Sequence, residues 1–159
     1  GGALDKDSLG TIVGWVNSTL PQEKPKHLLG IGAPEDFFIA VENGVDTFDC
    51  VLASRIARTS AVYTMSGRFN VSNQPYIRDF NPIDDECDCY TCTNYTRAYL
   101  CHLFRSKEMI AGTLATIHNE RFIVRLVDQI RQSIIDGNFF DMKADFLGRY
   151  AHKSGQSRD

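Results

Sequence analysis

Apolar and polar residues alternate in blocks along the first fifty positions, and each block has the period of one type of secondary structure. The opening GGAL has the character of a strand end. Residues 9–20 predict a helix because their apolar side chains recur at helical spacing, at Leu9, Ile12, Val13 and Val16. After a polar turn, the short apolar run HLLGIG (27–32) is typical of a buried strand.

The next block repeats the helix and the strand. Residues 36–43 predict a helix, which Pro34 can start in its first turn and Gly44 can close as a C-terminal cap. The run VDTFDCVL (45–52) predicts another strand. Strand, helix, strand, helix, strand is the pattern of a parallel sheet, so the sequence predicts an α/β fold.

The pattern changes after Cys50. Residues 61–64 and 68–71 flank Met65-Ser66-Gly67 and predict a hairpin. A helix is predicted over about 94–107, and a last long helix is predicted from Asn119, a residue suited to the N-cap, to Gly137. The long helix has one apolar face, formed by Phe122, Ile123, Leu126, Val127, Ile130 and Ile134.

Composition and charge limit the function classes. A chain of 159 residues with 43% hydrophobic and 23% charged residues can form a folded core. No apolar run is long enough to span a membrane, and nothing suggests secretion, so we expect a cytoplasmic protein. The net charge of −3 argues against nonspecific nucleic-acid binding. Residues 50–78, however, contain four arginines and no acid, a local bias that suits a phosphate backbone, although scattered surface arginines would look the same.

Three of the five cysteines form the motif C-x-C-x2-C at Cys87, Cys89 and Cys92. Thiolate is a soft ligand that suits zinc, whereas a disulfide framework is disfavoured in a chain with no sign of secretion. A fourth ligand must come from Cys101, His102, His118 or His152. We favour His118, because it comes just before the last predicted helix, where its ring can reach back. Three thiolates and a histidine would fill the tetrahedron, so we expect a structural site.

A carboxylate at a predicted strand end is the first candidate for chemistry. In parallel sheets and barrels, reactive groups lie at the C-terminal ends of strands. Asp49 is the carboxylate at such an end, and it could attack an anomeric carbon as in retaining glycosyl transfer. A strand-end aspartate also commonly caps the next turn. Cys50 competes as a nucleophile, although a cysteine in an apolar run is more often buried and inert.

The whole pattern resembles the C-terminal half of the bacterial type of tRNA-guanine transglycosylase (queuine tRNA-ribosyltransferase). The most specific segments are LLGIGAPEDFFIAVENGVDTFDCVLASRIAR, CDCYTC and IHNERF. The resemblance implies the C-terminal part of a (β/α)8 TIM barrel with an inserted zinc-binding subdomain. The implied parts are the last barrel strands and helices (1–60), a hairpin insertion (61–80), the zinc-binding subdomain (81–118), a C-terminal barrel helix (119–150) and a tail (151–159).

The resemblance also implies an activity. Enzymes of this family exchange guanine at the anticodon wobble position of tRNA for a 7-deazaguanine, the queuine precursor, through a covalent aspartyl-ribose intermediate. The family nucleophile falls on Asp49, and the ligands of the structural Zn²⁺ fall on Cys87, Cys89, Cys92 and His118. The family's second aspartate, its general base, belongs to an earlier strand that is not in this sequence. We therefore expect these residues alone to be a fragment without exchange activity.

Further positions follow from the same resemblance. Gly2, Ala3 and Leu29 match residues that contact the base, and Arg55 and Arg58 match arginines that bind anticodon-loop bases. An aromatic patch at the bacterial homodimer interface matches Tyr95, Tyr99 and His102, although such aromatics can simply pack within the subdomain.

A second hypothesis belongs to another class. The chain could be a noncatalytic, zinc-stapled tRNA-binding subunit or scaffold. A protein that only binds RNA has no need of a nucleophile, so Asp49 together with Arg55 and Arg58 favours the enzyme. A zinc protein of unrelated purpose would explain CDCYTC but not VDTFDC beside SRIAR.

Overall fold

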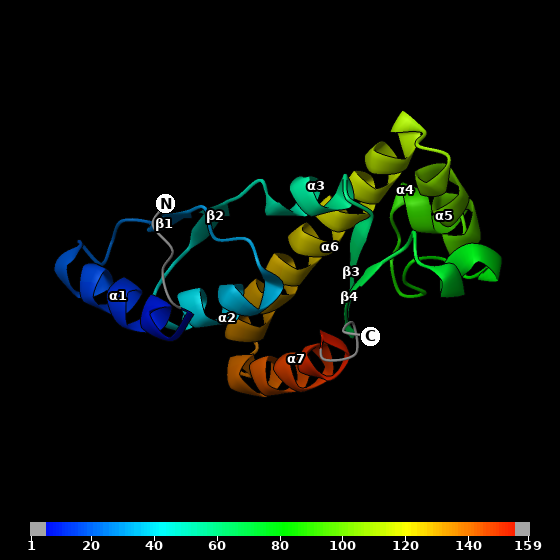
Figure 1. Cartoon of the computed structure of the whole chain (residues 1–159). Helices are drawn as coiled ribbons and strands as arrows, with labels where there is room; N and C mark the ends of the chain where they lie inside the picture. Colours follow the sequence, from blue (N-terminus) through cyan, green and yellow to red (C-terminus); the bar gives the residue numbers. More distant parts are fainter. Residues whose placement is uncertain (1–5, 155–159) are drawn as a thin grey trace. The chain divides into compact units, whose positions relative to one another are not determined.

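The computed structural model describes residues 6–154 (Figure 1). The chain divides into two compact units, 1–52 and 53–159. Each unit is described by itself below. The predicted strand at GGAL, with Gly2 and Ala3, lies outside the described residues.

Unit 1 is built on two parallel strands joined by a helix. It contains α1 (Lys6–Thr19), β1 (His27–Leu29), α2 (Pro34–Glu42) and β2 (Thr47–Asp49). The register pairs His27 with Thr47 and Leu29 with Asp49. The predicted order of helix and strand is confirmed, although both strands are shorter than the apolar runs that predicted them.

The ends of α2 explain why these residues form a helix. Pro34 occupies its first turn, where the missing N–H has no helical partner to lose. Gly44 follows the C-cap with φ +93°, a left-handed conformation that glycine adopts without steric cost. Leu9 and Val13 of α1 pack with Ala40 and Val45 in a buried core.

Unit 2 combines a hairpin with a group of helices. Helix α3 (Leu52–Ala57) starts at the unit boundary. The hairpin pairs β3 (Ala61–Thr64) with β4 (Gly67–Asn70) in antiparallel register, which confirms the predicted hairpin, although β4 begins and ends one residue earlier than predicted. The remaining elements are the 3₁₀ helix η1 (Gln74–Arg78), α4 (Tyr90–Asn94), α5 (Arg97–Arg105), α6 (Met109–Ile135) and α7 (Phe139–Ser154).

The core of unit 2 brings the hairpin, α5 and the first half of α6 together. Its buried residues are Ala57, Val62, Val71, Ile83, Leu100, Leu103, Ala111, Leu114 and Ala115. Helix α6 also contacts β3, α4 and α7, so it is the element on which the rest of this unit assembles (Figure 1).

Two helix predictions in unit 2 are wrong in their bounds. The long helix starts at Met109, ten residues before Asn119, because its buried apolar face continues backwards through Leu114 and Ala111, and Gly112 does not interrupt it. The helix predicted over 94–107 is α5, which begins only at Arg97, because Thr96 caps it by accepting a hydrogen bond from the Tyr99 N–H at 3.2 Å, and ends at Arg105.

The described residues show the predicted α/β character but not a complete barrel. The described residues contain one pair of parallel strands, β1 and β2, and no closed barrel. The mixture of helices and strands fits an α/β fold. No described helix is both long and apolar enough to cross a membrane.

Candidate functional site

Four side chains converge in unit 2, and they are the four that the resemblance implied. The ligand atoms of Cys87, Cys89, Cys92 and His118 all lie within 4.8 Å of one another. The cysteines come from the loop before α4 and from α4 itself, and His118 comes from the middle of α6. Three sulfurs and one imidazole nitrogen at this spacing form a possible metal-binding site.

The ring of His118 is oriented as a metal ligand requires. The residue is fully buried, and its Nε2 lies 2.7 Å from the main-chain carbonyl oxygen of Tyr63. A carbonyl can only accept, so Nε2 carries the proton and donates it. In the neutral ring Nδ1 is then unprotonated, and it faces the thiols, 3.3 Å from the Cys92 sulfur and 3.6 Å from the Cys89 sulfur. A carbonyl that fixes the tautomer of a histidine is a common support of metal sites.

The thiols of the cluster shift one another's pKa values. Hydrogen bonds with Cys87 and then Cys92 lower the pKa of the Cys89 thiol to about 3, whereas hydrogen bonds with Cys87 and then Cys89 raise the pKa of the Cys92 thiol. The Cys89 sulfur also caps α4 by accepting the Cys92 N–H at 3.3 Å. A thiolate is the form that binds metal, and the lowered pKa of Cys89 favours that form at one sulfur of the cluster.

Charged residues hold the cysteine loop against α6. Arg121 of α6 donates to both carboxylate oxygens of Asp88, at 2.7 and 2.8 Å. Arg125, one turn further along, donates to the main-chain oxygen of Glu86. The side chain of Asp84 accepts from the Glu86 N–H at 3.0 Å, which shapes the entry to the loop. The candidate metal site is therefore built by α6, α4 and the loop before α4, and several hydrogen bonds and an ion pair join that loop to α6.

Two of the other candidates for the fourth ligand, Cys101 and His102, lie away from the cluster. Cys101 is buried, with its sulfur 3.7 Å from the Asn73 carbonyl oxygen, and His102 is exposed. The side chain of His152 lies outside the part that is described. The prediction of His118 is confirmed as part of the cluster, but His118 lies within α6 and not just before a helix, as the sequence predicts.

The candidate nucleophile lies at the carboxyl end of β2 in unit 1. Asp49 is exposed and pairs with Leu29 in the parallel register. Two residues earlier on the same face, His27 Nδ1 lies 2.8 Å from Thr47 Oγ1, which shows that register partners share a face. Leu29 and Asp49 therefore project from the same face. The Gly30 N–H donates to the Asp49 carbonyl at 2.8 Å and closes this end of the sheet.

The competing nucleophile is more confined. The Cys50 side chain lies so close to Gly32 that a Cβ at that position would meet its sulfur and Cβ at 2.6 Å. The Leu52 N–H donates to the same sulfur at 3.4 Å. Cys50 is thus packed against the backbone, whereas Asp49 is open to a ligand.

Both candidate RNA-binding arginines are exposed side chains of unit 2. Arg55 lies in α3 and Arg58 directly follows it. Arg58 lies against α6, since a Cβ added to Gly112 would lie 3.6 Å from Arg58 Cγ.

The predicted aromatic patch is a real stack, and it is larger than predicted. The rings of Tyr95 and Tyr99 stack with centroids 5.3 Å apart. Tyr90, which is absent from the sequence prediction, contacts Tyr95 edge to face, with ring centroids 5.7 Å apart. The hydroxyl oxygens of the two residues lie 3.2 Å apart. Tyr90 and Tyr99 are well exposed, at 56% and 44%, and His102 is exposed as well. Such a surface suits a partner more than a core.

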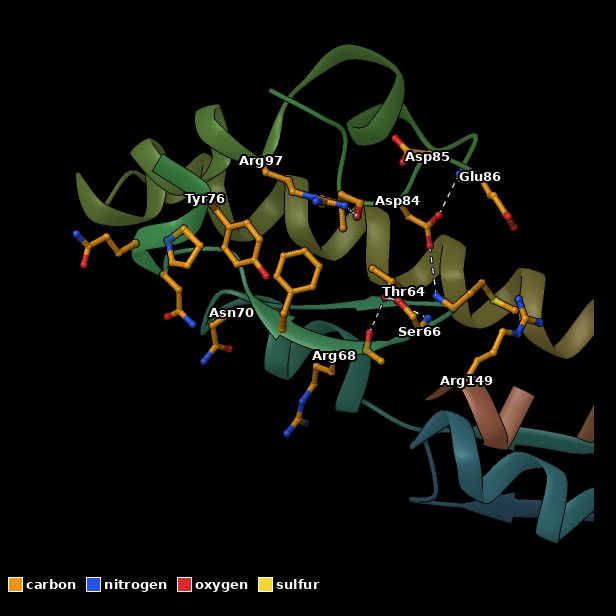
Figure 2. A pocket seen from close by; sticks show the side chains of 17 residues that line it. Thr64, Ser66, Arg68, Asn70, Tyr76, Asp84, Asp85, Glu86, Arg97 and Arg149 are labelled. Carbon is orange, nitrogen blue, oxygen red and sulfur yellow. Dashed lines mark hydrogen bonds between the residues drawn. The ribbon is translucent and has the colours of Figure 1, made fainter. Parts of the chain in front are cut away.

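A groove between the hairpin and the loop before the cysteines was also not predicted (Figure 2). It encloses about 990 Å³ and is lined in part by Tyr76, Asp84, Arg97 and Arg149. Asp84 accepts from two main-chain N–H groups, and Arg97 donates to Asp79 at 2.9 Å and to the Ile83 carbonyl at 2.9 Å. Asp84 and Arg97 thus take part in hydrogen bonds that hold the walls of the groove.

Comparisons with known proteins cover nearly the whole chain. The sequence model of queuine tRNA-ribosyltransferase matches residues 1–152. A queuine tRNA-ribosyltransferase of Caldanaerobacter subterraneus subsp. tengcongensis is 48% identical over 145 residues, which are 91% of this chain and 39% of that protein. The enzymes of the same name from Dictyoglomus turgidum and Bacillus subtilis are 45% and 42% identical, each over 96% of this chain. The chain spans about two fifths of the length of these relatives.

Proposed function

The chain belongs to the queuine tRNA-ribosyltransferase family, and from that premise we propose that it supplies the nucleophile and the zinc site of a tRNA-guanine transglycosylase. The reaction is the exchange of guanine at the wobble position of tRNA for a 7-deazaguanine, in queuosine biosynthesis in the cytoplasm. The observation that carries the proposal is the family match together with Asp49, an exposed carboxylate at the carboxyl end of a parallel strand.

Asp49 would act in two displacements. Its carboxylate attacks the ribose C1′ as the bond from C1′ to guanine N9 breaks, and guanine leaves with the electron pair and takes up a proton. The incoming base, after losing its own proton, attacks C1′ and displaces the carboxylate, so the configuration at C1′ is retained. Leu29, on the same face, would pack against the base, with Gly2 and Ala3 as further contacts.

The general base of the exchange is not assigned within this chain. We place it in the part of the family fold that lies outside the matched region, which is the larger part of each relative. We likewise propose that β1 and β2 are two strands of a (β/α)8 barrel, that α1 and α2 belong to its outer helices, and that the unmatched part of the family fold completes the barrel. The finer division predicted from the sequence, with boundaries at 60, 80, 118 and 150, also stays a prediction.

The metal would be Zn²⁺ with a structural role. Three thiolates and Nδ1 of His118 match its preferred tetrahedral donor set and leave no position for a substrate. When bound, zinc would hold the loop at 87–92 to α6, and the catalytic groups would lie elsewhere.

Arg55 and Arg58 would bind bases or phosphates of the anticodon loop, because exposed guanidinium groups offer several donors in a fixed planar arrangement. The exposed stack that includes Tyr95 and Tyr99, with His102 nearby, would form the interface of a homodimer.

Covalent trapping tests the reaction class. The full-length protein is incubated with a tRNA anticodon stem-loop and a purine analogue that cannot complete the exchange. We expect a covalent protein–RNA band on a denaturing gel. The band should disappear in Asp49→Asn and persist in Cys50→Ser, which is the matched control for a neighbouring nucleophile.

Absence of a band in the wild type, with zinc bound and RNA binding measurable, would contradict catalysis. It would favour the noncatalytic tRNA-binding subunit.

A further inference from the structure

The two candidate RNA-binding arginines lie on a segment with little support of its own. Helix α3 has only six residues, and the segment 53–61 continues through Ser60, whose φ is +70°. Residues other than glycine seldom adopt this left-handed conformation, so the surrounding structure must hold it. A short helix followed by such a turn needs an external tie to keep exposed side chains in fixed positions.

Asn119 ties both ends of this segment to α6. Its Nδ2 donates to the Ala53 carbonyl at 3.1 Å and to the Ala61 carbonyl at 3.0 Å. Its Oδ1 accepts from the Tyr63 N–H at 3.1 Å. The side chain is fully buried and uses both amide protons and its oxygen. One amide thus joins the start and the end of the segment that carries Arg55 and Arg58.

The same helix fixes the segment at a second point. Gly112 lies two helical turns before Asn119 and on the same side of α6. A Cβ there would lie 3.7 Å from Arg58 Cα, so the helix and the backbone of Arg58 are close together. Ala57 is also completely buried in the core that contains Ala111 and Ala115 of α6.

The candidate metal site is linked to the same strand residue as Asn119. His118 precedes Asn119, and its Nε2 donates to the carbonyl of Tyr63, the residue whose N–H bonds to Asn119. The side chain that offers Nδ1 to a metal and the side chain that holds the arginine segment therefore grip the same residue of β3.

We propose that Asn119 is a positioning residue that holds Arg55 and Arg58 in the geometry needed to bind RNA. The role rests on the proposed function, since it assumes that the two arginines bind the anticodon loop. Asn119 touches no RNA and no reacting atom, and it acts through the backbone at Ala53 and Ala61. Its loss weakens RNA affinity and leaves the chemical step at saturating RNA unchanged.

The test compares Asn119→Ala with Ile130→Ala in the full-length protein. Ile130 is a buried residue of the same helix, and none of the hydrogen bonds described for the segment involves it, so its truncation controls for lower stability. Should Asn119→Ala fail to fold, Asn119→Ser replaces it, because a serine hydroxyl can bond within its own helix but is too short to reach both carbonyls.

Two readouts follow. Hydrogen exchange of peptides covering 53–63 should accelerate at least about tenfold in the Asn119 variant and not in Ile130→Ala. The dissociation constant for an anticodon stem-loop RNA should rise about tenfold, with kcat at saturating RNA within about twofold of the wild type. Zinc content should stay unchanged.

A double-mutant cycle separates positioning from general damage. In a background of Arg55→Ala and Arg58→Ala, the Asn119 substitution should have no further effect on RNA affinity, because the groups that it positions are gone. An additive loss, or an RNA affinity equal to that of Ile130→Ala, would overturn the proposal.

The proposed function and this inference can fail separately. If the wild type does not bind the stem-loop, the proposed function fails, and hydrogen exchange still decides whether Asn119 holds the segment. Unchanged exchange at 53–63 would overturn the positioning role whatever the RNA result.

Discussion

His118 shows how one residue joins the metal site to the fold. Its Nδ1 faces the thiols, and its Nε2 donates to the buried Tyr63 carbonyl at 2.7 Å. The two bonds depend on each other, because donation from Nε2 keeps Nδ1 free to bind a metal. Removal of the ring would therefore cost a metal ligand and also leave a buried carbonyl without its partner.

Replacement of His118 by alanine should remove both contributions. We expect zinc content to fall well below one ion per chain and the free energy of unfolding to drop by at least about 3 kcal/mol, since structural zinc binding is coupled to folding. Cys101→Ala is the matched control: Cys101 is buried but lies outside the cluster, so this variant should keep its zinc. Metal analysis and thermal unfolding measure both quantities. Full zinc occupancy in His118→Ala would show that another group completes the site.

The sequence predicts some of the residue roles and not others. The C-x-C-x2-C spacing was sufficient to predict a metal site, because three thiols in one short loop have few other uses. Asn119 was predicted as an N-cap, since asparagine is favoured there. Its actual partners, Ala53 and Ala61, are more than fifty residues away, and no local pattern could reveal them.

At the scale of elements, the junction of η1 and α5 depends on one ion pair. Arg97, at the start of α5, donates to Asp79 and to the Ile83 carbonyl, and its guanidinium lies 5.4 Å from the centroid of the Phe69 ring. Burial raises the pKa of Asp79, but hydrogen bonds from Asn81 and Arg97 outweigh it and hold the pKa below its ordinary value. The carboxylate therefore stabilises the fold while it is ionised.

Arg97→Met should test this junction through pH. The variant keeps the apolar stem beside Phe69 but loses the charge, so we expect a loss of about 1–3 kcal/mol at pH 7. Because the pKa of Asp79 is lowered in the folded state, the ion pair contributes to the free energy of unfolding above about pH 4. This contribution disappears as the pH falls further. Denaturant unfolding from pH 7 to pH 3 should show the gap to the wild type closing.

Arg149→Met provides the control for this experiment. Arg149 pairs with Asp145 one turn away on α7, and both side chains are largely exposed. Such pairs contribute less than about 0.5 kcal/mol. A gap for Arg97→Met that is equally small, or that does not change with pH, would contradict the assigned role of the ion pair.

Element bounds were predictable where a local breaker exists and not where packing decides. Gly44 and Gly137 were predicted to end helices, and both follow a helix end with positive φ. The start of α6 was misplaced because the face that packs on the hairpin continues through Ala111. Helix α7, which begins at Phe139, was not distinguished from α6, since only one residue separates Gly137 from its start.

At the scale of the whole molecule, the exposed tyrosine stack is the proposed site of dimer formation. Tyr99 stacks on Tyr95 and is 44% exposed, and exposed aromatic groups of this kind commonly anchor interfaces. Tyr99→Ala in the full-length protein should raise the dimer dissociation constant at least about tenfold, as measured by analytical ultracentrifugation over a concentration series.

An exposed aromatic residue elsewhere in unit 2 controls for lost apolar surface. Phe140, at the start of α7, is 67% exposed, and Phe140→Ala should leave the dimer unchanged. Equal weakening by both substitutions would mean that the dimer does not use the tyrosine stack.

The contacts along β3 have a consequence for the behaviour of the protein in solution. On the side of β3 away from β4, the Ala61 carbonyl accepts from Asn119, and Tyr63 donates its N–H to Asn119 and accepts at its carbonyl from His118; just beyond the strand, the Met65 N–H donates to Asp84. These are the groups that an incoming polypeptide would need in order to extend the hairpin into a larger sheet. Because side chains already occupy them, this edge is closed to strand addition, and the hairpin is protected from intermolecular β-aggregation on that side.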